Sequence, residues 1–252
     1  MLTTQRKKLL LARLAAEGQL VAKDLAAELG TSEDTIRRDL RELAAEGKLQ
    51  RVHGGALPAS PALGDLRVRE ELSAADKLAL GRHGAALIEP GQVVILDGGT
   101  TAIQVARHLP RELRATIVTH SPNVAVEAAA CPGVEILVLG GRLFRHSMVN
   151  VGAAVLDAAA RLRADLYFLG ITGVHPEAGL TTGDAEEADV KRALMRSAAE
   201  TVVLASAEKL MAASPFVVAP LREAGHVIIP RATPERITRA LRASGTTVRK
   251  AS

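Results

Sequence analysis

The chain has 252 residues, 48% hydrophobic and 24% charged, which are the values of a globular protein with room for two domains. Its net charge of +4 permits a polyanionic partner without requiring one, and its single cysteine excludes an internal disulfide and a cysteine-based zinc site. No apolar run approaches 18 residues and no signal-peptide cleavage site follows the N-terminus, so we expect a cytoplasmic protein without a membrane partner.

The first two predicted helices cover residues 4–17 and 21–29. Gly18 ends the first, with Arg6 and Arg13 expected on its outer side, and Gly30 closes the second. A short turn then leads into a third helix. Two short helices joined by a tight glycine-containing turn form a helix-turn-helix, whose second helix enters the DNA major groove.

The third predicted helix begins at Thr31 and ends near Glu46. Its apolar residues recur with helical period at Ile36, Leu40 and Leu43. Ser32 suits an N-cap, and the acidic residues after it suit the positive end of the helix dipole. Polar side chains on the remaining faces suit base edges and phosphates; they are Ser32, Thr35, Arg37, Arg38 and Arg41. Taken alone, a solvated helix with its arginines paired to Asp39 and Glu42 is the favoured alternative.

Residues 48–57 alternate apolar and polar side chains and contain the turn Gly54-Gly55. This pattern predicts a small hairpin, or wing, that places Arg51 and His53 along the phosphate backbone. An ordinary exposed histidine is an equal alternative for His53.

Residues 5–57 resemble the DNA-binding domain of DeoR-family bacterial transcription regulators. The resemblance runs through the helix at 25–29, the run Ser-x-x-Thr-Ile-Arg-Arg-Asp-Leu at 32–40 and the wing at 51–56, and the central run is specific to the family. Val21 departs from it, because relatives often carry a serine there that caps the second helix. The resemblance implies a winged helix-turn-helix over residues 1–58 that binds double-stranded operator DNA.

The rest of the chain is predicted to be an α/β domain. A proline- and glycine-containing break sets a linker at 59–75 and a second domain at 76–252. Apolar strands alternate with helices at 93–96, 115–119, 134–139, 166–171, 201–205 and 226–229. This alternation predicts a mostly parallel sheet covered on both faces. Residues 244–252 are predicted to be a frayed basic tail.

The loop Asp97-Gly98-Gly99-Thr100-Thr101 lies between a predicted strand and the start of a helix. Glycines let the backbone approach a ligand, and a helix N-terminus offers unpaired N–H groups to an anion. The loop predicts a phosphate cradle, with a tight threonine-capped turn as an equal alternative. It matches neither the Walker pattern nor Gly-x-Gly-x-x-Gly, so no nucleotide is predicted, and we expect no other cofactor and no metal.

Residues 76–230 resemble the DeoR C-terminal sensor domain, whose fold is that of ribose-5-phosphate isomerase and coenzyme A transferases. The resemblance implies a pocket for a phosphorylated sugar or related metabolite. In it Gly99, Thr100 and Thr101 would hold phosphate, Thr119 and Ser121 would meet hydroxyls or phosphate, Lys209 would supply positive charge and Asp97 would accept from sugar hydroxyls. The full candidate set is Asp97, Gly98, Gly99, Thr100, Thr101, Thr119, His120, Ser121, Gly140, Gly141 and Lys209.

Two positions depart from the family. His120 stands where relatives usually have asparagine, and Ser206 where they have aspartate, which leaves the Lys209 side of the pocket less acidic and the sugar undetermined. For Arg142, Arg145 and His146 an exposed basic loop is favoured over a ligand contact. Lys191 and Arg192 are expected to be solvated, with Lys191 kept as a secondary candidate.

These patterns predict a ligand-responsive transcription regulator, a repressor that acts as a homo-oligomer, a dimer or higher. The resemblance to the DeoR family implies that it regulates carbohydrate-metabolism genes. The alternative is a sugar-phosphate isomerase or acyl transferase of the same fold. Isomerisation needs a positioned carboxylate base, and no carboxylate follows the strand at 166–171 before Glu177. We therefore expect no enzyme, although four carboxylates remain candidate bases: Asp97, Asp184, Glu186 and Glu208.

Overall fold

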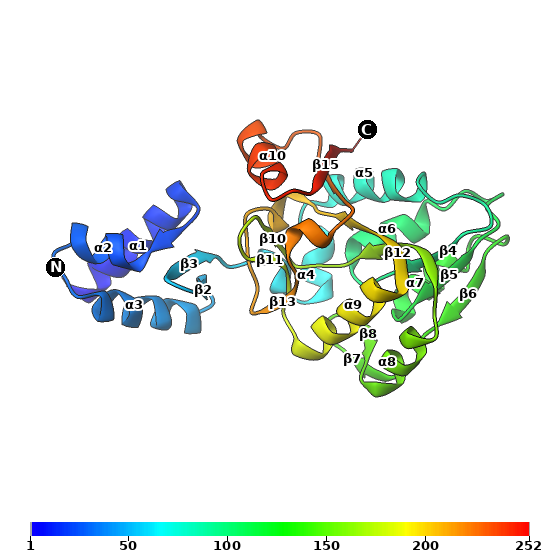
Figure 1. The fold of residues 1–252 in the computed structure, drawn as a ribbon, viewed down its shortest axis with the longest axis horizontal. Coiled ribbons are helices and arrows are strands. Elements are labelled where there is room, and N and C mark those ends of the chain that lie inside the picture. Colours follow the sequence, from blue (N-terminus) through cyan, green and yellow to red (C-terminus); the bar gives the residue numbers. More distant parts are fainter. Residues whose placement is uncertain (1, 252) are drawn as a thin grey trace.

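The computed structural model describes residues 2–251. Figure 1 shows a small N-terminal domain joined by a single connecting stretch of chain to a larger α/β domain. No helix within the described residues is both long and apolar enough to cross a membrane.

The N-terminal domain combines three helices with a small antiparallel sheet. The helices are α1 (Thr3–Glu17), α2 (Ala22–Glu28) and α3 (Glu33–Ala45), and the strands are β1 (Leu20–Val21), β2 (Leu49–Val52) and β3 (Gly55–Pro58). The strand order is β1-β3-β2, so the predicted hairpin carries a third, unpredicted strand. A Cβ at Gly55 would lie 1.7 Å from the Leu20 carbonyl oxygen, so only glycine lets β1 and β3 pair here.

A buried ion pair fastens α1 to α3. Arg6 pairs with Asp39 through two hydrogen bonds, one of 3.2 Å from Nη2 to Oδ1, and both residues are buried. The prediction that Arg6 lies on the outer side of its helix is therefore wrong, and Asp39 is not a partner of the α3 arginines. Arg13 does face outward, where it pairs with Glu17 and Glu28.

The larger domain is built on a seven-stranded sheet in the order β15-β14-β12-β9-β4-β5-β6. Every pairing in it is parallel, which confirms the predicted parallel α/β sheet. Its strands are β4 (Val93–Leu96), β5 (Thr116–Thr119), β6 (Glu135–Val138), β9 (Ala164–Leu169), β12 (Ala198–Leu204), β14 (His226–Ile229) and β15 (Thr247–Lys250). The predicted frayed tail is wrong, because β15 pairs with β14 and buries Val248.

Helices cover both faces of this sheet. One core cluster joins the sheet to α5 (Ala74–Ala85), α6 (Thr100–Arg107) and α7 (Pro122–Ala128), and the other joins it to α8 (Ala153–Ala160), α9 (Ala185–Ser197) and α10 (Glu235–Arg242). Successive side chains of the central strand β9 point to opposite faces of the sheet, since Phe168 belongs to the first cluster and Tyr167 to the second.

Several short elements were not predicted. They are the hairpin of β7 (Arg142–Phe144) and β8 (Val149–Val151), and a sheet of β10 (Gly173–His175), β11 (Gly179–Thr182) and β13 (Phe216–Ala219). Single 3₁₀ turns occur at η2 (Ala207–Lys209) and η3 (Leu221–Glu223). Polar residues or glycines break the apolar run in β7, β8, β10 and β11, so the sequence does not mark these segments as buried strands.

The chain between the two domains is ordered. It forms the 3₁₀ turn η1 (Pro61–Leu63) and the helix α4 (Leu66–Glu71). Ala59 forms a bridge with Ala213, and the Ser60 hydroxyl donates to the Thr172 carbonyl. Residues 59–71, the connecting segment, therefore pack against the larger domain.

Candidate nucleic-acid interface and ligand pocket

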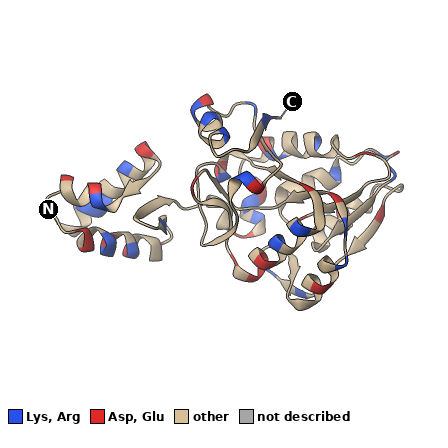
Figure 2. Cartoon of the chain, in the orientation of Figure 1, with Lys and Arg blue, Asp and Glu red and all other residues tan. Residues whose placement is uncertain are grey.

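The helix α3 turns one face inward and leaves the other free for a partner. Ile36, Leu40 and Leu43 are buried. The Ser32 Oγ caps the helix by accepting from the Thr35 backbone N–H at 3.2 Å, and it lies 2.9 Å from the Thr35 hydroxyl. Basic residues alternate with acidic ones along this helix (Figure 2).

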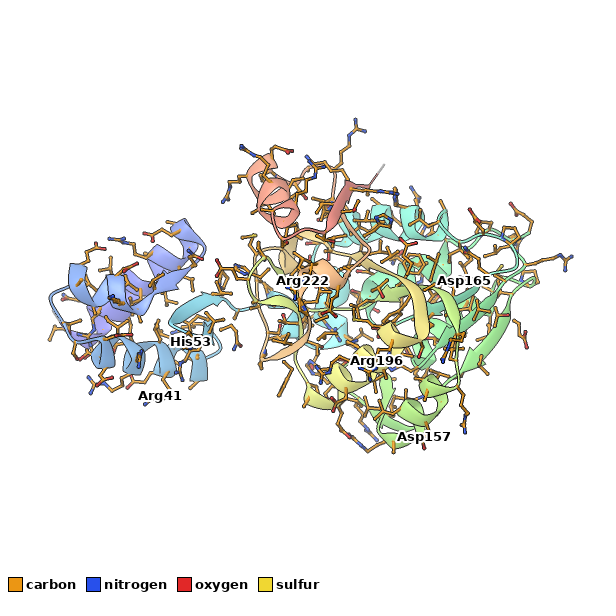
Figure 3. All side chains as sticks on the ribbon, in the orientation of Figure 1. Arg41, His53, Asp157, Asp165, Arg196 and Arg222 are labelled. Atoms are coloured by element: carbon orange, nitrogen blue, oxygen red, sulfur yellow. The ribbon has the colours of Figure 1, made fainter. Side chains whose placement is uncertain are left out.

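The arginines of α3 project from its exposed side. Arg37 pairs with Glu33 at 2.7 Å across one helical turn, while Arg38 and Arg41 are exposed and form no ion pair with any residue of 2–251. Figure 3 labels Arg41 on α3 and His53 at the neighbouring hairpin. A groove between α3 and the hairpin is lined by Arg37, Arg51 and His53 together. Helix and wing thus present their predicted DNA contacts on one continuous surface.

The ligand pocket lies at the carboxyl ends of β4, β9 and β12, where ligands bind in open parallel sheets. Five predicted residues line it together: Gly98, Gly99, Thr100, Thr101 and Lys209. Gly99 begins helix α6 with a φ of 100°, a left-handed conformation that favours glycine. The Lys209 Nζ lies 3.4 Å from the Thr101 hydroxyl, so a lysine and a helix N-terminus share one cavity.

The other predicted residues do not line this cavity. Thr119, His120 and Ser121 are fully buried behind it, and Gly140 and Gly141 are exposed outside it. The Thr119 hydroxyl accepts from the Ser121 N–H, and the Ser121 hydroxyl donates to the Met148 carbonyl. In this structure their polar atoms hold neighbouring loops together.

Asp97 forms a buried network behind the loop of residues 98–101. It is 0% exposed and accepts from Lys191 at 3.0 and 3.1 Å, from the Tyr167 hydroxyl at 2.5 Å and from His120 Nε2 at 2.7 Å. The backbone N–H groups of Gly98 and Gly170 also donate to it. Its predicted role as an acceptor for sugar hydroxyls does not fit, because protein donors occupy both oxygens.

Two opposing effects act on the pKa of Asp97 in this network. Burial by itself raises the pKa of Asp97, but the Lys191 charge and the hydrogen bonds from His120 and Tyr167 outweigh burial and leave that pKa well below its usual range. Lys191 is 3% exposed, so the prediction that it is solvated is wrong. It lines the pocket on one side and anchors Asp97 on the other.

Further polar residues of the pocket were not predicted. They are Arg69, Lys77, Ser147, Thr172, Thr182 and Glu187, together with Glu208, which was considered only as a candidate base. The lining holds the cations Arg69, Lys77, Lys191 and Lys209 against the carboxylates Glu187 and Glu208. Asp97 offsets one of these charges from behind the wall, and an excess of positive charge remains.

Comparison with known proteins places both parts of the chain in one family. The family profile of the DeoR C terminal sensor domain matches residues 72–230, and that of the DeoR-like helix-turn-helix domain matches residues 6–61. The HTH-type transcriptional regulator GlpR of Haloferax volcanii is 34% identical over 212 residues, 83% of each chain. The glycerol-3-phosphate regulon repressor of Escherichia coli is 30% identical over 82% of each chain.

Two solved structures are also similar to parts or all of the chain. Ribose 5-phosphate isomerase A from Methanocaldococcus jannaschii has a TM-score of 0.40 at 20% identity and covers 54% of each chain. The full-length sorbitol operon regulator SorC from Klebsiella pneumoniae has a TM-score of 0.43 at 13% identity and covers 95% of this chain and 98% of its own.

Proposed function

We propose that a phosphorylated sugar or polyol in the pocket controls the affinity of this protein for operator DNA. The chain belongs to the DeoR family of transcription regulators and is a DNA-binding repressor with a C-terminal sensor domain. The regulated genes would be those of carbohydrate metabolism, as the similarity to a glycerol-3-phosphate regulon repressor suggests. We also propose a cytoplasmic location, because operator DNA is the partner.

One observation carries the choice of ligand. Arg69 Nε and Glu208 Oε2 are both buried without a hydrogen-bond partner in the described residues, and both residues line the pocket. A buried polar group left unpaired costs about 1–3 kcal/mol, so each atom favours a ligand that completes it. A phosphorylated sugar or polyol does both, because its phosphate accepts from a guanidinium and its hydroxyls donate to a carboxylate.

Lys209→Ala tests the pocket. We expect phosphorylated sugars or polyols to raise the melting temperature of the wild-type protein and their unphosphorylated counterparts to have no effect. The substitution should remove this stabilisation and release by the ligand, while DNA affinity without ligand stays unchanged. Lys250→Ala, an exposed lysine of β15, is the matched control. Normal release of DNA by ligand in the Lys209→Ala protein would refute the proposed pocket.

Binding of the anion should depend on pH through Lys209. Burial, together with the charges of Lys77, Arg69 and Lys191 and against the opposing effect of Glu208, lowers the pKa of Lys209 to about 8. A bound phosphate restores the charged form, so affinity should fall and proton uptake should appear as the pH rises above about 8.

Calorimetry in two buffers of different ionisation enthalpy measures this uptake. A phosphate monoester loses its second proton near pH 6, so the ligand stays a dianion between about pH 7.5 and 9.5 and the uptake belongs to the protein. Lys209→Met should take up no proton. Affinity that is constant across this range would contradict the assignment.

The oligomeric state sets how the DNA-binding surfaces reach the operator. We propose a dimer or higher oligomer that presents paired α3 helices to half-sites about 34 Å apart.

We also propose that the chain binds its effector without converting it. The relatives named above are regulators, and the loop after β9, residues 170–176, holds no carboxylate base.

A further inference from the structure

The connecting segment forms part of the ligand pocket. It follows β3 of the DNA-binding domain directly, and two of its residues, Ala62 and Arg69, line the cavity beside the loops of the sheet. It is held against the larger domain at its start, where the Ser60 N–H donates to the Ala213 carbonyl at 3.3 Å and its hydroxyl to Thr172. The wall of the pocket and the tether of the DNA-binding domain are therefore the same piece of chain.

Arg69, on α4, is the unusual residue of this segment. It is 8% exposed, and the one hydrogen bond found for its guanidinium in residues 2–251 runs from Nη2 to the His146 carbonyl at 3.3 Å. Nε has no partner, and no carboxylate lies within ion-pair distance among the described residues. Burial lowers the pKa of Arg69 against the opposing charges of Glu187 and Asp65. A buried cation without a direct counter-ion is costly, and an anionic ligand relieves that cost.

The surroundings hold Arg69 in place from behind. Lys77, on α5, donates through Nζ to the carbonyls of Arg69 and Leu72 and lies 3.3 Å from Glu208 Oε1. The backbone of α4 is thereby fixed at its C-terminal end. Arg69 lines the same cavity as the N-terminus of α6 and Lys209.

We propose that Arg69 binds the anionic group of the effector, so that the effector clamps the connecting segment onto the sensor domain. This inference rests on the proposed function and assigns it a mechanism. A phosphate that accepts from Arg69 on one side and from the backbone N–H groups of the 99–101 loop on the other joins α4 to α6. Binding of the effector in the pocket then restrains the connecting segment, which follows β3 of the DNA-binding domain.

The clamp explains how a small ligand reaches a distant DNA surface. A ligand shifts a conformational equilibrium only by its difference in affinity for the two states. Contact with Arg69 supplies such a difference, because it exists only when the connecting segment is docked. Orientations of the N-terminal domain that require an undocked segment become less populated when the ligand is bound.

Hydrogen exchange with inorganic phosphate as the probe tests the clamp in the full-length protein. We expect phosphate to stabilise the wild type and to slow amide exchange in α4, residues 66–71. Arg69→Met keeps an apolar stem of similar length and should weaken phosphate binding roughly 10- to 100-fold, the loss expected for charge-assisted hydrogen bonds. It should also abolish the slowing in α4. Arg67→Met, an exposed arginine of the same helix, is the matched control and should behave as wild type.

The outcomes separate this inference from the function on which it rests. If phosphate stabilises the protein and Lys209→Met removes that effect while Arg69→Met does not, the pocket stands and the clamp is overturned. If neither phosphate nor phosphorylated sugars stabilise the wild type, and Lys209→Met behaves identically, both fall. The wild-type measurement decides even if Arg69→Met fails to fold, because phosphate binding with unchanged exchange in α4 also overturns the clamp.

Discussion

Replacing Arg37 and Arg38 together by alanine is expected to abolish operator binding while leaving ligand-induced thermal stabilisation intact. Both side chains project from the exposed face of α3, and Arg37 also lines the groove shared with the wing. Each arginine contact to DNA contributes about 1–3 kcal/mol. The pair therefore accounts for roughly 30-fold to 10⁴-fold in affinity, and the slope of log affinity against log salt should fall by about 1 for each arginine that contacts phosphate.

A second pair of arginines provides the control for net charge. Arg236 and Arg239 are exposed on α10, in the larger domain, so their double replacement by alanine removes the same charge away from α3. We expect this variant to bind DNA like the wild type in a titration followed by fluorescence anisotropy. Unchanged operator affinity in the α3 variant, with its melting temperature preserved, would show that α3 does not enter the groove.

Asp97→Asn is expected to destabilise the sensor domain strongly. The amide keeps the shape but removes the charge that compensates buried Lys191. Each Asp97 oxygen accepts from three donors, so the NH2 group of the amide faces three donors at whichever position it takes. Breaking a buried ion pair costs about 3–5 kcal/mol, a large part of the about 5–15 kcal/mol that holds a domain folded. Chemical denaturation should show a lower free energy of unfolding for the sensor domain and an unchanged N-terminal domain.

The pH dependence identifies the carboxylate as the cause. The pKa of Asp97 lies far below the unfolded value of about 3.9, so its stabilisation is complete above that value and is lost only as the pH falls through the folded one. The difference between wild type and variant should thus be flat from about pH 5 to 7 and shrink only in strong acid. Asp157→Asn, exposed on α8 and labelled in Figure 3, makes the same change without burial and should be neutral. If the free energy of unfolding of Asp97→Asn equals that of the wild type at every pH, the Asp97 network does not stabilise the fold.

The sequence predicts the elements whose pattern is long enough to show a period. The spacing of Ile36, Leu40 and Leu43 predicts α3, and apolar runs predict six of the seven strands in the main sheet. The seventh, β15, is predicted as a basic tail because Val248 is the one apolar residue in its sequence Thr-Val-Arg-Lys. Its place depends on the edge that β14 offers, which is a tertiary effect.

The loop of residues 98–101 in the pocket is predictable because its glycines and threonines are contiguous. The presence of Arg69 and Lys77 in the pocket could not be predicted. Arg69 lies in a segment whose sequence indicates a charged connection, and Lys77 lies in an ordinary helix. Lys191 and Arg6 show the same limit. A charged residue on a helix is usually solvated, and only the position of a distant carboxylate, Asp97 or Asp39, makes its burial possible.

The order of strands in the main sheet sets the order in which the molecule can be completed during synthesis. Strand β4 must wait for β9, since Val94 pairs with Leu166, and the β14 edge stays open until β15 has been made. The N-terminal domain closes within a much shorter stretch, with Leu20 pairing with Ala56. Contacts between distant residues form late, and N-terminal domains fold first on the ribosome. During synthesis, a folded DNA-binding domain is therefore attached for a time to a sensor domain whose main sheet is still incomplete.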